Sequence, residues 1–103
     1  MAEGLTAQGK RVDATPGGPD DYPFPRLKSG EYGKDVNGLW YCVPPGRDPF
    51  SFMGTLGDGS GVKCHTVIEH EDGTITVTPS ILISSHEGSW HGYLKRGVWE
   101  EIV

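Results

Sequence analysis

Apolar and polar residues alternate in short runs through residues 38–103, which predicts β-strands. TITVT places Ile75 and Val77 on one face and three threonines on the other. Turn signals at EDG and at Arg96-Gly97 separate neighbouring runs, and Pro79 is expected to end or kink the strand that contains it. No 3.6-residue period is sustained, so the pattern predicts an all-β fold, a small antiparallel β-sandwich or barrel.

The first 34 residues carry a different pattern, with six Gly and four Pro and no His, Cys or Trp. The prolines of TPGGPDDYPFPR exclude a helix and remove donors that a central strand needs. We therefore expect two parts, an extended Gly/Pro-rich N-terminal arm over residues 1–34 and a compact β domain over residues 35–103.

The arm is open to two interpretations, a disordered tail or a segment that docks on a partner. Docking would use its large apolar side chains, because aromatic groups dominate interface energies. The candidate binding residues are Tyr22, Phe24, Leu27 and Tyr32. If the arm only docks, deletion of residues 1–28 should leave the β domain folded.

Charge and hydropathy narrow the range of partners. The net charge of −5 argues against non-specific nucleic-acid binding, which needs clustered Lys and Arg. No apolar run reaches the roughly 18 residues of a membrane span, and MAEGLTAQGKRVD lacks the apolar region of a secretory signal. The two cysteines are too few for a disulfide scaffold, although a single bridge between Cys42 and Cys64 is left open.

Several residues are of types that bind metals or catalyse reactions, but their spacing is not that of a known site. Zinc ligands usually come in close pairs such as C-x2-C, and the candidates here are scattered: Cys42, Cys64, His65, His70, His86 and His91. Cys64 and His65 are adjacent, so on a strand they would point to opposite faces. Zinc binding stays the lesser alternative, and we expect no metal and no cofactor.

Serine catalysis has equally weak support. Four serines (Ser80, Ser84, Ser85 and Ser89) lie near two histidines, with Asp72 as a carboxylate that could orient an imidazole, but no G-x-S-x-G turn is present. GDGSG lacks the lysine of a phosphate-binding loop and is typical of a hairpin tip. We expect no catalytic residue.

Aromatic residues are more numerous in residues 38–103 than a small core can hold. Trp90 and Trp99 flank the last turn and are expected to pack in the body of the domain. The others are Trp40, Tyr41, Phe50, Phe52 and Tyr93. One or two aromatic side chains should therefore lie at a surface that docks another molecule.

HTVIEHEDGTITVTPSILI, followed by WHGYLKRGVWEEI, resembles a family of small uncharacterised proteins encoded by tailed phages of actinobacteria. The resemblance covers about residues 38–103 and not the arm. It implies a phage origin and no particular activity. Some distant relatives carry Cys pairs that suggest a metal, where this chain has SSHEGS.

A phage origin favours a non-enzymatic virion accessory protein. We expect a capsid-decorating (cement) protein that binds the shell, and with it the major capsid protein, through its β-body and arm. Its location would be the virion, assembled in the host cytoplasm, and homo-oligomerisation is left open. The alternatives are a cytosolic phage effector that binds a host protein or small ligand, and a small zinc-binding protein.

Overall fold

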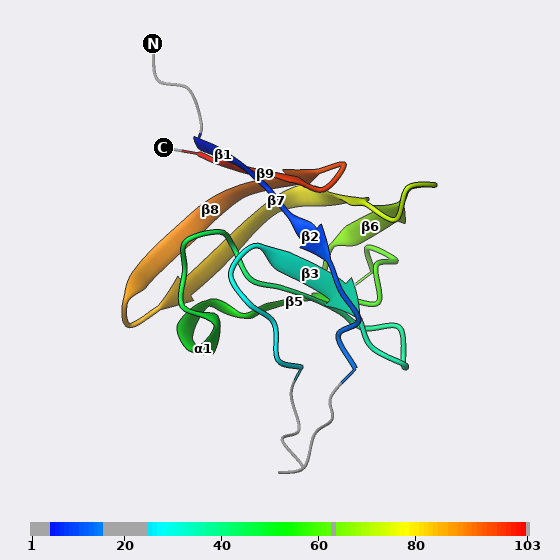
Figure 1. Cartoon of the computed structure of the whole chain (residues 1–103), viewed down its shortest axis with the longest axis horizontal. Helices are drawn as coiled ribbons and strands as arrows, with labels where there is room; N and C mark the ends of the chain where they lie inside the picture. The colour runs from blue at the N-terminus through cyan, green and yellow to red at the C-terminus, as the bar shows by residue number, and fades with distance from the viewer. Residues whose placement is uncertain (1–4, 16–24, 63, 103) are drawn as a thin grey trace.

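The computed structural model describes residues 5–15, 25–62 and 64–102, and nearly all of its regular structure is β-strand (Figure 1). The first half of the chain supplies β1 (Leu5–Gln8), β2 (Lys10–Arg11), β3 (Glu31–Lys34), β4 (Trp40–Cys42) and β5 (Gly54–Gly57). The second half supplies β6 (Thr66–Glu69), β7 (Ile75–Ser85), β8 (Gly88–Lys95) and β9 (Val98–Glu101). A single turn of helix, α1 (Pro49–Phe52), precedes β5.

The strands form two sheets that pack as a sandwich, which confirms the all-β prediction. One sheet has the order β1-β9-β8-β7-β6 and is antiparallel throughout. The other has the order β2-β3-β4-β5, with one parallel pair between β2 and β3. No helix in the described residues is long and apolar enough to cross a membrane.

The core between the sheets is built from the alternating positions that the sequence indicated. Ile75 and Val77 are buried, as predicted, and so are Trp90 and Trp99, whose rings meet edge to face with centroids 5.3 Å apart. The remaining members of this cluster are Tyr32, Trp40, Cys42, Phe52, Leu56, Ile81 and Leu94.

Local turn chemistry also matches the prediction. Gly73 in the β6–β7 turn has φ of 87°, and the β8–β9 turn places Arg96 and Gly97 at φ of 46° and 78°. Pro79 kinks its strand rather than ending it. Strand β7 continues to Ser85, and its register against β8 shifts between Val77 and Ile81, because proline cannot donate a ladder hydrogen bond.

The N-terminal segment is where the structure corrects the sequence prediction. Strand β1 pairs along its whole length with β9, and the two lie side by side in Figure 1. Strand β3, also within residues 1–34, lies between β2 and β4. The described parts of residues 1–34 are therefore strands of the sandwich, and the boundary at residue 34 does not separate an arm from residues 35–103. Three of the four prolines fall in residues 16–24, outside the described residues.

Gly9 lets one extended segment serve both sheets. Its N–H donates to the Gly97 carbonyl at 2.7 Å, between the end of β1 and the start of β2. A Cβ at this position would lie 2.8 Å from that carbonyl oxygen and 2.9 Å from Trp99 Nε1, so no larger residue fits without movement. The segment thus crosses from one sheet to the other directly above the core.

Helix α1 is the second departure from the sequence prediction, which treated residues 38–103 as β throughout. Asp48 caps the helix by accepting from the Phe50 N–H at 3.1 Å, and Pro49 occupies the first turn, where its missing N–H costs nothing. One turn is too short to show a helical period in the sequence.

Candidate functional site

Two of the four predicted binding residues, Leu27 and Tyr32, lie among the described residues, and both are buried. Tyr32 is 1% exposed within the main core, and Leu27 is 5% exposed in a second cluster with Ala14 and Val43. Both side chains pack in the cores of this chain. Their burial contradicts the prediction that they anchor a partner, and the prediction failed because large apolar residues are typical of a core as well as of an interface. Tyr22 and Phe24 lie outside the described residues.

Phe50 is instead the most exposed aromatic residue in the part of the chain that the structure describes, with 85% of its surface exposed. Its backbone is fixed by α1, where Phe52 fills the core at 3% exposure and its N–H donates to the Asp48 carbonyl at 2.9 Å. Arg47 lies over the Phe52 ring and also donates to Glu101 at 3.2 Å, which ties this segment to β9. Phe50 confirms that one of the surplus aromatic residues lies at the surface, and the docking role of that surface stays a prediction.

A small apolar recess of about 120 Å³ adjoins the Phe50 ring. Besides Arg26, its lining is almost entirely carbon. We call the residues Pro25, Leu27, Pro49, Phe50 and Met53 the Phe50 patch. The patch combines residues from two distant parts of the chain, which is why no local motif pointed to it.

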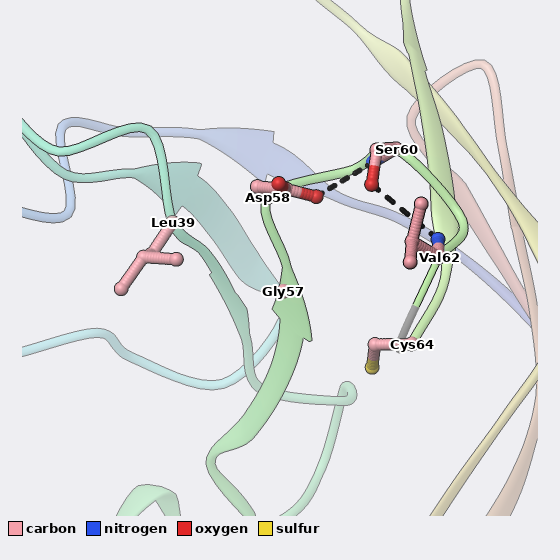
Figure 2. A pocket seen from close by; sticks show the side chains of 6 residues that line it. All are labelled: Leu39, Gly57, Asp58, Ser60, Val62 and Cys64. Atoms are coloured by element: carbon pink, nitrogen blue, oxygen red, sulfur yellow. Dashed lines mark hydrogen bonds between the residues drawn. The ribbon is translucent and has the colours of Figure 1, made fainter.

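A larger pocket of about 420 Å³ lies between the β3–β4 turn and the loop after β5 (Figure 2). It is lined by Leu39, Gly57, Asp58, Ser60, Val62 and Cys64. The Asp58 carboxylate accepts from the Ser60 N–H at 2.9 Å, and the Ser60 hydroxyl oxygen accepts from the Val62 N–H at 3.3 Å. These turns fix the loop that the sequence marked as a hairpin tip, and we call this hollow the Cys64 pocket.

The Cys64 pocket holds an arrangement that strand alternation did not predict. Cys64 Sγ lies 3.1 Å from His65 Nδ1, although the two residues are adjacent in the chain. They precede β6, which begins at Thr66, so the strand geometry that would send them to opposite faces does not apply. The His65 ring is held on its other side, where Nε2 lies 3.1 Å from the Ser80 carbonyl oxygen.

The two thiols have opposite environments, and neither forms a disulfide. Cys42 is completely buried in the core, and that burial, with a smaller contribution from Cys64, raises the pKa of its thiol to about 12. Cys64 is exposed to solvent at the pocket. Only the second thiol is open to a reagent.

Two of the remaining histidines, His91 and His70, make separate polar contacts. His91 Nε2 lies 2.8 Å from the Ser80 hydroxyl, and His70 Nε2 lies 2.7 Å from the Thr76 hydroxyl. Asp72, the candidate orienting carboxylate, accepts from Thr74 instead. Among the described residues, no three His, Cys, Asp or Glu side chains gather closely enough to hold a metal ion.

A charged cluster over the Trp40 ring joins the two sheets. Arg11 and Lys34 lie 4.9 and 5.5 Å from the Trp40 ring centroid, and both contact the Glu69 carboxylate. Hydrogen bonding from Lys34 is the main cause that lowers the pKa of Glu69, and Arg11 adds to it. The cluster links β2, β3 and β6 and is satisfied within the chain, so it serves the fold.

Comparison of the chain with protein-family models, with curated proteins and with solved structures finds no match.

Proposed function

We propose that the protein is a non-enzymatic accessory protein of a phage virion, a capsid-decorating protein that binds the shell through the Phe50 patch. The observation that carries the binding role is the exposure of Phe50, 85%, on a helix turn whose backbone is anchored on both sides. The phage origin rests on the resemblance of residues 38–103 to proteins of actinobacterial tailed phages.

The chemistry of the patch suits a protein partner. Burying an aromatic ring removes roughly 150–250 Å² from water, a gross gain of about 4–6 kcal/mol at ~25 cal/mol per Å². Since α1 already fixes the position of Phe50, little of that gain is lost in ordering the segment. Pro49 and Met53, which are half-buried in the lining of the same recess, add apolar surface against which a partner can pack.

Repetition on a shell would make one such contact sufficient. A single small patch gives weak binding, but many copies on a regular lattice convert weak contacts into firm attachment when neighbours also touch. The shell partner is therefore expected to present an apolar groove that accepts a phenyl ring, once per repeating unit.

Mass spectrometry of purified particles of the encoding phage tests the location. A decorating protein is expected in a fixed ratio to the major capsid protein. Its recovery from infected cells but not from particles would refute the virion role and favour a cytosolic effector.

Substitution of Phe50 tests the binding surface. Phe50→Ser should lower the affinity for particles by about tenfold or more, equivalent to ~1.4 kcal/mol, while leaving thermal unfolding almost unchanged because the ring is exposed. Val36→Ser is the matched control, since Val36 is similarly exposed at 79% but lies in the β3–β4 turn, outside the patch. Full attachment of the Phe50 variant, or equal loss in both variants, would contradict the assignment of this surface.

A further inference from the structure

The Cys64–His65 pair has the geometry of a thiol beside its own base. Sγ lies 3.1 Å from Nδ1, within reach of a hydrogen bond that involves sulfur. The thiol is exposed, and it lines a pocket of about 420 Å³ that a small molecule can enter. A nucleophile in contact with a base that a third group holds in place is the general pattern of an activated nucleophile.

The Ser80 carbonyl decides which nitrogen of His65 can act. A carbonyl oxygen only accepts hydrogen bonds, so Nε2, at 3.1 Å from it, carries the hydrogen in the neutral ring. Nδ1 then has a free lone pair, and it faces the sulfur. Ser80 lies within the register shift that Pro79 imposes on β7, so the kink in this strand sets the orientation of the imidazole.

We propose that Cys64 is a nucleophilic thiol, with His65 as its base, that forms mixed disulfides with small cationic disulfides entering the Cys64 pocket. The thiol proton passes to His65 Nδ1, and the thiolate attacks one sulfur of the incoming disulfide. Its S–S bond breaks as the new bond to Cys64 forms, and the released thiolate takes up the proton. The incoming disulfide is the oxidant, so electrons and protons balance.

The pocket lining supplies the preference for a cation. Hydrogen bonds from Ser60 lower the pKa of the Asp58 carboxyl, so this residue is negatively charged at neutral pH. Leu39 and Val62 present apolar carbon at the same pocket and suit a short aliphatic chain. The Thr55 carbonyl, 3.4 Å from Sγ, is a second acceptor for the thiol proton and competes with His65 at a longer distance.

The test measures the reaction of the full chain with cystamine at pH 7, with mass spectrometry to locate the modified residue. Cys42 is an internal control because it is buried. The peptide of residues 60–68 serves as the reference, since it has the same side chains without the fold. We expect the folded protein to react at Cys64 about tenfold faster than the peptide. An equal or slower rate would overturn the proposal without any need for a variant.

Substitution of His65 then distinguishes its role as a base from its structural contact with the Ser80 carbonyl. His65→Gln keeps a donor for the Ser80 carbonyl but has no basic nitrogen, and should slow the reaction at pH 7 by about tenfold. At pH 9, where hydroxide can take the proton of a thiol without a neighbouring base, its rate should approach that of the unmodified protein. His86→Ala, at the exposed β7–β8 turn, is the control. Equal rates for His65→Gln and the unmodified protein at pH 7, or an equal defect at both pH values, would overturn the role of His65.

A separate experiment tests the charge preference, which the proposal assigns to the Asp58 carboxylate in the pocket lining. Cystamine should react faster than dithiodiglycolate, its anionic counterpart, and Asp58→Asn should reduce that ratio. If both disulfides react alike with the unmodified protein, the assigned cation preference is wrong.

Discussion

Two tryptophans of the core meet edge to face but differ in one hydrogen bond. Trp99 donates through its indole N–H to the Gly30 carbonyl at 2.9 Å, at a buried position. The indole N–H of Trp90 is equally buried and has no hydrogen-bond partner among the described residues. The hydrogen bond of the Trp99 N–H therefore stabilises the fold, whereas burial of the Trp90 N–H destabilises it, although the two rings occupy the same cluster.

Replacing each tryptophan by phenylalanine should expose this difference. Both changes remove a similar volume, but only Trp99→Phe removes a hydrogen bond. The Gly30 carbonyl keeps the Lys10 N–H at 3.1 Å as a donor, so the loss is that of one hydrogen bond, about 0.5–1.5 kcal/mol. We expect Trp99→Phe to lower the free energy of unfolding more than Trp90→Phe, as measured by urea titration of the two variants. A larger loss for Trp90→Phe would show that its N–H has a partner after all.

Glu69 gives the stability a defined pH dependence at the residue scale. Because its pKa is lowered in the folded state, Glu69 stabilises the fold above its ordinary pKa of 4.5, and this contribution is lost as the pH falls through the folded value. Its side chain is 44% exposed, so solvent screening holds the effect below about 1 kcal/mol. Glu69→Gln should be less stable than the unmodified protein at pH 7, and the gap should close as the pH falls below the ordinary pKa of 4.5 and through the lower folded value.

Thermal unfolding at several pH values measures this gap, and Glu87→Gln at the β7–β8 turn controls for the loss of one negative charge. A gap that stays constant from pH 7 to pH 3 would mean that the Glu69 carboxylate contributes through packing rather than through Lys34 and Arg11.

At the scale of elements, the hairpins from β6 to β9 followed from the sequence because both strands and their turn are local. The alternation in TITVT and the glycines at positions 73 and 97 were enough to place them. The strand β1 could not be found in this way, because it pairs with β9 at the opposite end of the sequence. Its four residues, LTAQ, do alternate apolar and polar, but the run is short and only weakly apolar, so it does not stand out from the Gly/Pro-rich sequence around it.

The candidate sites show the same limit. An excess of aromatic residues predicted an exposed one, but only the single turn of α1 determines that it is Phe50. The contact between Cys64 and His65 depends on irregular backbone before β6, and an assumed strand geometry hides it. Local pattern predicts regular elements, whereas sites formed by irregular segments require the tertiary structure.

Gly9 provides the element-scale prediction. A methyl group there would press on the Gly97 carbonyl and on the Trp99 ring nitrogen, so Gly9→Ala should destabilise the protein by about 1–3 kcal/mol through overpacking. Gln8→Ala, one residue earlier on an exposed position, should cost less than about 0.5 kcal/mol. Equal melting temperatures of the two variants would mean that the β1–β2 segment shifts to accommodate a methyl group without a loss of stability.

At the scale of the whole molecule, the chain passes from one sheet to the other twice, between β1 and β2 and between β5 and β6. The β1–β2 segment crosses between the sheets at Gly9, and the loop after β5 joins β6 through the Val67 N–H, which donates to the Gly59 carbonyl at 2.9 Å. Removing the first connection would expose one edge of each sheet together with the Trp99 side of the core.

Deletion of residues 1–15 should therefore abolish cooperative unfolding rather than leave the domain intact. Circular dichroism during thermal denaturation checks this, and a synthetic peptide of residues 5–15 added in excess should restore part of the transition by pairing with β9 and β3. An unchanged melting temperature of the truncated protein would mean that its N-terminal segment is a separable arm, as the sequence predicted.

The pairing of β1 with β9 also determines how the sandwich would respond to a pulling force. The two strands are antiparallel, and the first residue of β1, Leu5, pairs with the last residue of β9, Glu101. A force that pulls on the chain before Leu5 and after Glu101 therefore acts at the same end of the two paired strands. The load falls on one hydrogen bond at a time and peels the strands apart, instead of shearing all their bonds together. The strand pair that completes the fold is therefore its weakest point under tension, and an attachment made through the Phe50 patch would bypass it.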